Sequence, residues 1–253
     1  MNAVLERILA TERVSDGSTS LPLRHPDFPA LRVAVDREEG ELLQQAVADI
    51  QPRVSVEIGC AYGVSTLYIC EALATLPHAS RHIVIDPFQS TQWRGIGRRH
   101  LTDAGLDSFV DFREDFAELA LASLLRDEVR IDLAFVDGWH TFDQVMLEFY
   151  FLNRLLRVGG VIVFDDADRR SVNRVVRHAL TYPSYRLYAT TGRPTRVSAA
   201  GRVRRALAKL PPVAAIVRPD VLRRDWDLGI LASCVAIRKI ADDRRTSGWD
   251  SDF

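Results

Sequence analysis

The chain has 253 residues, of which 47% are hydrophobic and 26% charged, and its formal net charge is −1. This length fits one large domain with additions, and the composition is ordinary for a globular protein. The overall charge identifies no partner, and with no long apolar run and no secretory signal we expect no membrane span. The three cysteines follow no metal-ligand spacing. We therefore expect free thiols and a cytoplasmic protein.

Residues 1–50 are predicted to form an N-terminal arm before the main domain. Residues 1–13 fit a short amphipathic helix. Residues 15–30 contain three prolines and several small polar residues, which predicts irregular chain that could cover a functional site. Residues 36–50 carry apolar side chains at helical spacing, with Asp36 placed as an N-cap, and predict a second helix.

The main domain, residues 51–240, alternates apolar strands with amphipathic helices. Such alternation predicts a parallel sheet with helices on both faces. In chain order, we expect strands at residues 54–58, 81–86, 108–113, 131–137, 161–165, 185–190 and 228–238. We expect the intervening helices at residues 64–76, 91–104, 116–126, 141–157 and 170–181. The predicted fold class is therefore α/β, a doubly wound sheet of seven strands.

The first strand of this domain ends in a glycine turn, within the stretch VSVEIGCAYG at residues 54–63. Glu57 lies near the end of the strand, Gly59 and Gly63 follow, and a helical pattern begins at Val64. In such a unit a ligand lies at the carboxyl end of the strand, where glycine lets the backbone approach it. The spacing E-x-G-x-x-x-G lacks the second glycine of the dinucleotide fingerprint, which disfavours a dehydrogenase and a phosphate-bearing ligand. A tight turn without a ligand is the structural alternative.

Acidic residues end four of the predicted strands: Glu57, Asp86, Asp137 and Asp165. The carboxyl ends of parallel strands meet at one edge of a sheet, so we expect these side chains to gather there with Asp166. Like charges this close need a cation or hydrogen-bond donors. Asp86, at the end of the second strand, could accept both hydroxyls of a ribose. A solvated acid at the strand end is the alternative.

A second group of residues follows the fourth and fifth strands, in the segments FVDGWH and FDD. Carboxylate oxygens of Asp137, Asp165 and Asp166 would suit Mg²⁺, which could hold a substrate hydroxyl and lower its pKa. His140 lies three residues after Asp137 and can take a proton near neutral pH. The alternatives are helix capping by the aspartate pair and a surface histidine.

The order of these motifs resembles the class I S-adenosylmethionine (SAM) methyltransferases, and within them the metal-dependent small-molecule O-methyltransferases. The resemblance covers roughly residues 36–190 and returns at 228–239. The catechol and caffeoyl-CoA branches carry an EEG…L pattern before the first strand, which is matched here by Glu38, Glu39, Gly40 and Leu43. The resemblance implies a Rossmann-like sheet whose last strand is antiparallel.

The resemblance also implies a SAM site along the glycine turn, which in this family cradles the methionine half of the cofactor. Asp115 would meet the adenine amino group, and Phe116 would pack near the adenine ring. The full set of implied SAM-binding residues is Glu57, Gly59, Gly63, Asp86, Asp115, Phe116 and Asp137.

The implied metal and catalytic residues follow the family with two departures. The family places a metal aspartate at the Asp137 position and an Asp-Asn pair at Asp165–Asp166, where this chain has a second aspartate. The catechol and caffeoyl-CoA branches place a catalytic lysine three residues after the first metal aspartate, where this chain has His140. This DGxH form is similar to bacterial methyltransferases that act on sugars and antibiotic intermediates.

These implications predict a SAM-dependent O-methyltransferase for a hydroxylated small molecule (a sugar, a phenol or an antibiotic intermediate) in secondary metabolism. In direct displacement at the SAM methyl carbon, the protein mainly orients the two reactants. A divalent cation and His140 would assist. The alternatives are a metal-independent methyltransferase and a non-catalytic SAM-binding partner protein. A nucleic-acid methyltransferase is disfavoured, because the fourth strand is not followed by an Asn/Asp-Pro-Pro-Tyr-like tetrapeptide.

A basic insert separates the last two strands. Residues 186–224 contain ten Arg or Lys and one acid, and residues 197–210 fit a basic amphipathic helix. The insert, at 190–227, could be a lid or oligomer contact, a clamp for an anionic substrate, or an attachment to nucleic acid or a membrane surface. No aromatic pattern interleaves the arginines, which disfavours nucleic acid. The tail, residues 241–253, is predicted to be disordered, and a homodimer is expected from the family rather than from the sequence.

Overall fold

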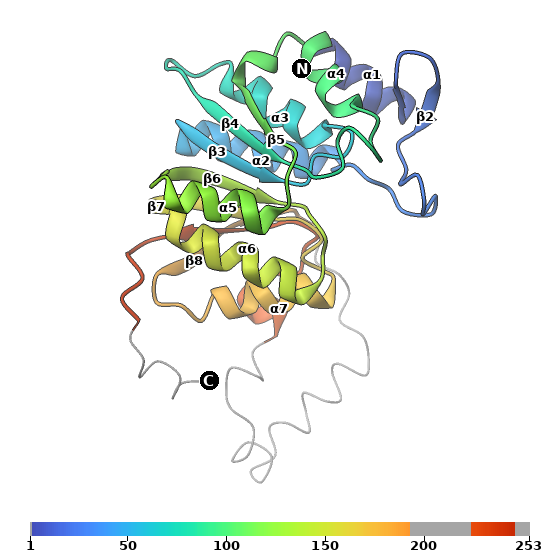
Figure 1. Ribbon diagram of the computed structural model, residues 1–253. Coiled ribbons are helices and arrows are strands. Elements are labelled where there is room, and N and C mark those ends of the chain that lie inside the picture. Colours follow the sequence, from blue (N-terminus) through green and yellow to red (C-terminus); the bar gives the residue numbers. More distant parts are fainter. Residues whose placement is uncertain (1, 193–223, 246–253) are drawn as a thin grey trace, which may run out of the picture.

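The computed structural model describes residues 2–192 and 224–245, and its centre is a seven-stranded sheet between two layers of helices (Figure 1). In chain order the strands are β3 (Val54–Ile58), β4 (Arg81–Ile85), β5 (Val110–Arg113), β6 (Ile131–Val136), β7 (Leu156–Phe164), β8 (Tyr185–Thr190) and β9 (Val235–Lys239). Their order across the sheet is β5-β4-β3-β6-β7-β9-β8. β9 runs antiparallel to both of its neighbours, β7 and β8, and the other neighbouring strands of this sheet pair in parallel. The predicted α/β class and the antiparallel last strand are confirmed.

Each face of the sheet is covered by its own layer of helices. One apolar core joins the sheet to α1 (Ala3–Thr11), α2 (Arg37–Ile50), α3 (Val64–Leu73) and α4 (Ile96–Asp103). The other joins it to α5 (Ala117–Arg126), α6 (Phe142–Leu155) and α7 (Arg170–Ala179). On β6, Leu133 and Phe135 contribute to the first core and Ala134 and Val136 to the second, because successive strand side chains point to opposite faces.

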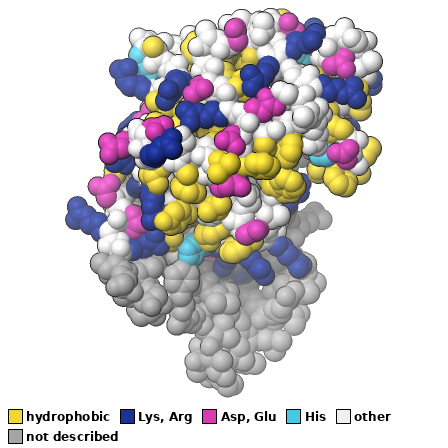
Figure 2. Space-filling model, in the orientation of Figure 1, with side chains coloured by type: hydrophobic (Ala, Val, Ile, Leu, Met, Phe, Trp, Pro, Cys, Tyr) yellow, Lys and Arg dark blue, Asp and Glu magenta, His cyan; other side chains and the backbone are white. Residues whose placement is uncertain are grey.

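The outer face of α5 and α6 keeps apolar side chains in contact with solvent. Leu119, Phe142 and Tyr150 are exposed on these two helices. Figure 2 shows hydrophobic side chains gathered on the face where these helices lie in Figure 1. Contiguous apolar surface of this kind is more frequent at contacts between proteins than elsewhere.

The fifth strand is longer than predicted. We expected it at residues 161–165, after a helix ending at 157, but β7 already begins at Leu156. Leu156 pairs with Ile131 of β6, and the register shifts between Ile131 and Leu133. Gly159 and Gly160, which follow the predicted end of the helix, therefore lie inside the strand. A side chain at Gly160 would come 2.8 Å from the Asp132 carbonyl oxygen, so glycine is needed for this close approach.

Two other boundaries are set by glycines in the left-handed conformation. The helix expected from residue 91 begins only at Ile96, because Gly95, with φ +65°, precedes it, and η1 (Asp107–Phe109) leads into β5. The strand expected from residue 228 begins only at Val235. The short helix α11 (Asp225–Leu228) occupies the expected start, and Gly229, with φ +71°, ends it.

The N-terminal arm is more regular than predicted. β1 (Arg13–Ser15) and β2 (Ser20–Pro22) form an antiparallel hairpin where irregular chain was expected. Asp16 closes its turn, because one carboxylate oxygen accepts the Ser18 and Thr19 N–H groups at 2.9 and 2.7 Å. The predicted N-cap is confirmed, since the Asp36 side chain caps α2 in a complete capping box with Glu39.

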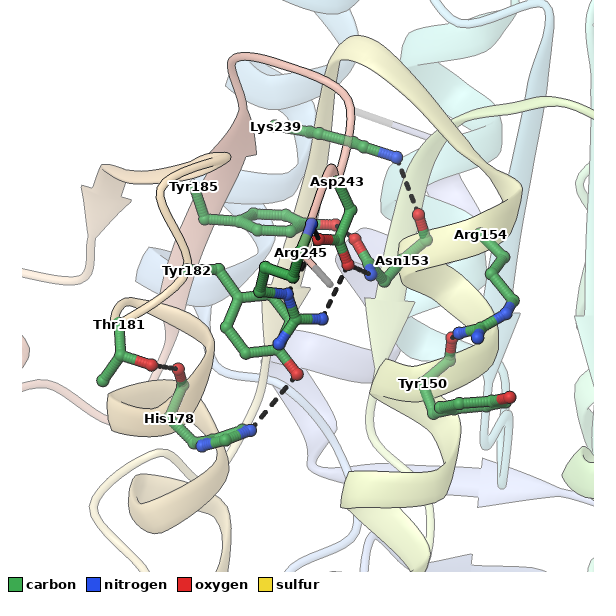
Figure 3. Close-up of polar contacts among 10 residues, drawn as sticks. All are labelled: Tyr150, Asn153, Arg154, His178, Thr181, Tyr182, Tyr185, Lys239, Asp243 and Arg245. Carbon is green, nitrogen blue, oxygen red and sulfur yellow. Dashed lines mark hydrogen bonds and ion pairs between the residues drawn. The ribbon is translucent and has the colours of Figure 1, made fainter. Parts of the chain in front are cut away.

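The predicted basic helix at 197–210 lies outside the described residues. Of the predicted disordered tail, residues 241–245 are described, and they contact α6 and the chain after α7 (Figure 3). Asn153 Nδ2 donates to Asp243 at 2.7 Å, and the Arg245 guanidinium stacks on the Tyr182 ring. No helix in the described part of the chain combines the length and apolarity that a membrane crossing requires.

Asn153 joins this C-terminal contact to the core, because its Oδ1 accepts the buried Tyr185 hydroxyl at 3.0 Å (Figure 3). We expect Asn153→Ala to lower the free energy of unfolding by about 2 kcal/mol, since that hydroxyl loses its partner. Chemical denaturation measures the change. Arg154→Ala, which removes an exposed guanidinium stacked on Tyr150, is the matched control, with an expected loss below about 1 kcal/mol. Equal losses for the two variants would contradict the assignment.

Candidate active site

The predicted acidic residues do gather at one edge of the sheet. Main-chain hydrogen bonds place them there: Asp86 N–H donates to Arg113 O at 3.1 Å, and Asp137 N–H to Ile58 O at 2.9 Å. Asp165 N–H donates to Val136 O at 3.0 Å. Each bond continues a parallel ladder by one residue past a strand end. The edge is therefore lined by carboxylates from neighbouring strands.

The glycine turn is shaped by contacts within the protein. Gly59 has φ +86°, and a side chain there would lie 2.0 Å from the Asp137 carbonyl oxygen. Gly63 has φ +77° and faces the Cα of Gly97, at 3.0 Å from the position of an added Cβ. We expected these glycines to make room for a ligand. The structure shows that the turn first needs them to pack against the chain after β6 and against α4.

Asp86 holds this turn by accepting its N–H groups. One carboxylate oxygen accepts from Cys60 at 3.1 Å and Ala61 at 2.9 Å, and the other from Phe88 at 2.9 Å. Burial raises the pKa of Asp86, and these hydrogen bonds oppose the rise. The oxygen bonded to Phe88 retains a lone pair for one further donor. The solvated alternative is wrong for this residue, because its side chain is buried.

Glu57 lies below the turn, with its side chain fully buried. One of its oxygens accepts the Ser65 hydroxyl and the other contacts His82 Nε2 at 2.8 Å. The structure therefore brings Glu57 to the turn but commits its carboxylate to the interior of the protein.

Three aromatic rings flank the turn on its outer side. Phe88 is edge-on to Phe116, with ring centres 6.1 Å apart, and to Trp139, with ring centres 5.9 Å apart. Phe116 and Trp139 are 46% and 63% exposed, so two of the rings are free to contact a ligand. Asp115 is exposed beside them, and its carboxylate accepts the Phe116 N–H at 2.8 Å. The predicted adenine-binding pair thus lies within an aromatic group.

A cluster with the donor set of a divalent metal site is formed by Asp137, His140 and Asp166. One ligand atom from each residue lies within 4.8 Å of the others. His140 Nε2 is 3.3 Å from Asp137 Oδ1 and 3.0 Å from Asp166 Oδ2, without the geometry of a hydrogen bond to either. A nitrogen placed between two carboxylate oxygens fits a shared cation or a proton. Asp165, which we predicted as a ligand, is outside this cluster and lies against the Asp137 side chain.

The electrostatics of this cluster reflect burial and crowding. Burial, and then the charge of Asp166, raise the pKa of Asp137 well above its usual range. Burial, and then the charge of Asp137, do the same for Asp165. Burial lowers the pKa of His140, against the opposing effect of the Asp166 charge. A bound cation would relieve the repulsion among these carboxylates.

Two acidic residues near the cluster were missed from the sequence. Glu39 reaches it from α2, where its carboxylate accepts the Ser233 hydroxyl at 2.6 Å, and burial raises its pKa. The EEG pattern was the available signal. Glu148 is buried on α6, one oxygen close to Gly138, and burial raises its pKa to about 7. No sequence signal distinguished it from a surface acid on an amphipathic helix.

The Gly59 contact predicts a large loss of stability on substitution. Gly59→Ala is expected to cost more than about 3 kcal/mol of unfolding free energy, because backbone strain adds to the clash with Asp137. Gly105→Ala is the matched control: φ is +69°, nothing lies within 4 Å of the added Cβ, and the expected cost is about 1 kcal/mol. Thermal or chemical denaturation measures both variants. Equal costs would show that the close approach is easily relieved.

Residues 56–167 match the family model described as a methyltransferase domain. A probable caffeoyl-CoA O-methyltransferase of Arabidopsis thaliana is 30% identical over 148 residues, which cover 55% of this chain and 59% of that protein. The match thus spans less than two thirds of that relative.

Solved structures show the same fold. The O-methyltransferase TomG of Streptomyces achromogenes, in complex with SAM, is 22% identical, with a TM-score of 0.59 over 74% of this chain and 82% of that chain. The methyltransferase PaMTH1 of Podospora anserina, with S-adenosylhomocysteine (SAH) bound, is 16% identical. Its TM-score is 0.61, and the match covers 94% of this chain and 88% of that chain. The chain therefore shares the fold of these methyltransferases, and its residues 56–167 match the model of a methyltransferase domain.

Proposed function

We propose that this protein is a SAM-dependent O-methyltransferase that acts on a hydroxyl of a small molecule with the help of a divalent cation such as Mg²⁺. One observation carries the proposal: the glycine turn and the cation-ligating cluster adjoin. The Asp137 carbonyl packs on Gly59, while the Asp137 side chain belongs to the cluster with His140 and Asp166. A methyl donor bound at the turn would thus lie beside an oxygen held at the cluster, as direct displacement requires.

The cofactor would lie along the turn. Asp86 offers its remaining lone pair toward a ribose hydroxyl, and Phe116 and Trp139 offer exposed ring surface for an adenine. SAM supplies the electrophilic methyl carbon, so the task of these residues is to orient it. Gly59 and Gly63 shape the turn, and Asp115 stands at the exposed end of the aromatic group.

Asp137 and Asp166 would hold the cation, with Asp165 next to Asp137. A divalent cation in this position lowers the pKa of a hydroxyl that coordinates it. Arg169 Nε lies 2.8 Å from Asp166 Oδ2 and fixes that carboxylate. Burial favours the neutral form of His140, whose Nε2 would accept the hydroxyl proton as a general base.

The charge of the basic insert supports a class of methyl acceptor. Because residues 186–224 contain ten Arg or Lys and one acid, we propose an acceptor with an anionic group, within the sugar, phenolic or antibiotic classes of secondary metabolism. We further propose that the protein acts in the cytoplasm. The exposed apolar side chains on α5 and α6, such as Leu119 and Phe142, support a homodimer.

Calorimetric titration of SAH tests the cofactor assignment. We expect wild-type protein to bind SAH with or without Mg²⁺, and Asp86→Ala to weaken binding at least about tenfold, because the turn loses its anchor. Asp103→Ala, an exposed acid on α4, should leave the dissociation constant unchanged. Wild-type protein that binds neither SAM nor SAH would overturn the proposed function.

Titration with Mn²⁺, followed by its paramagnetic signal, tests the cation site. We expect Asp137→Ala and Asp166→Ala to weaken Mn²⁺ binding at least about tenfold, whereas Asp168→Ala, an exposed acid in the same loop, leaves it unchanged. His140→Ala should retain Mn²⁺ affinity if His140 is the base. Loss of affinity in that variant would make His140 a ligand, and no binding by wild type would favour the metal-independent alternative.

A further inference from the structure

A chain of four buried polar side chains runs beneath the glycine turn. Ser55 Oγ and His82 Nδ1 are 2.9 Å apart, and His82 Nε2 and Glu57 Oε2 are 2.8 Å apart. Ser65 Oγ donates to Glu57 Oε1 at 2.5 Å. All four side chains are buried, Glu57 and His82 completely. We refer to these four residues as the buried polar chain.

The sheet register brings these groups together. Ser55 on β3 and His82 on β4 are direct partners, and Glu57 points to the same face as Ser55, because strand side chains alternate. The intervening Val56 and the following Ile58 face the opposite core. Burial of an imidazole and a carboxylate is costly unless both are paired, and His82 and Glu57 pair with each other here.

One tautomer of His82 completes the hydrogen bonds of the chain. With the proton on Nε2, His82 donates to Glu57 and its Nδ1 accepts the Ser55 hydroxyl. The second Glu57 oxygen accepts from Ser65. Removing His82 would leave one buried oxygen of Glu57 without a donor, and the Glu57 side chain would then have to move to find another.

The buried polar chain closes the turn from below. Glu57 precedes the turn and Ser65 follows it, in the first helical turn of α3, so their hydrogen bond links its two ends. From the other side, Asp86 accepts the N–H groups of Cys60 and Ala61. Both supports originate from β4, since His82 lies within it and Asp86 directly follows it. The turn is thus held between two carboxylates.

We propose that His82 is a positioning residue for the cofactor site: by holding Glu57 against Ser65 it keeps residues 59–63 in the shape that receives SAM. The proposal rests on the proposed function. It also assigns Glu57 an indirect role, in place of the direct SAM contact that the family resemblance implies. The residue acts through the turn and touches no reacting atom.

SAH titration of His82 variants tests the proposal. His82→Leu should raise the SAH dissociation constant at least about tenfold. His82→Gln, whose amide can donate to Glu57, should stay within about threefold of wild type. Ser65→Ala removes the other contact to Glu57 and should also weaken SAH binding. In the double variant with His82→Leu, the loss of binding free energy should be smaller than the sum of the two separate losses, because both residues act through Glu57.

A matched control separates positioning from general stability. Tyr185→Phe removes another buried hydrogen bond, to Asn153, on the far side of the sheet, and should lower the melting temperature without changing SAH affinity. If His82→Leu and Ser65→Ala lower the melting temperature but leave SAH affinity unchanged, as this control does, the proposal is overturned. If His82→Leu does not fold, the Ser65→Ala affinity decides alone. Absence of SAH binding by wild type overturns the proposed function and this inference with it.

Discussion

The contact between Gly59 and the Asp137 carbonyl ties together the two halves of the candidate site. β3 and β6 are neighbouring parallel strands at the centre of the sheet, and their ends meet so closely that a Cβ at residue 59 would lie 2.0 Å from that oxygen. Because a packed interior does not deform continuously, the glycine turn and the loop of residues 137–140 cannot shift independently. The proposed methyl donor and the proposed cation are therefore placed relative to each other by the backbone.

The carboxylates of this edge are accommodated in two ways. Glu57 and Asp86 accept N–H or O–H groups of their own chain, so their charge stabilises the turn. Asp137 and Asp165 have few such donors and lie against each other. Burial raises the pKa of both, and the charge of Asp166 adds to the rise for Asp137 and that of Asp137 to the rise for Asp165. The first pair has a structural role in the protein as it stands. The second leaves electrostatic strain that a divalent cation would remove.

Segments outside the matched methyltransferase domain complete the edge. Glu39 belongs to α2, before residue 56, and Ser233 precedes β9, after residue 167. Their hydrogen bond, together with the one from Ala167 N–H to the Ser233 carbonyl, connects the N-terminal arm and the last strand to the loop that carries Asp166. The capping box of α2 thus stabilises a helix end and the site at once.

The order of the main strands and helices, and the edge at which the acids gather, could be predicted from the sequence. Both depend on local periodicity and on the rule that parallel strands end on the same side. The starts of β7 and β9 depend on tertiary contacts, because pairing of β7 with β6, and of β9 with β7 and β8, sets those limits. The tertiary structure also decided which acids face solvent. Glu57 is enclosed because His82 and Ser65, distant in sequence, meet it through strand register, and no local pattern encodes that meeting.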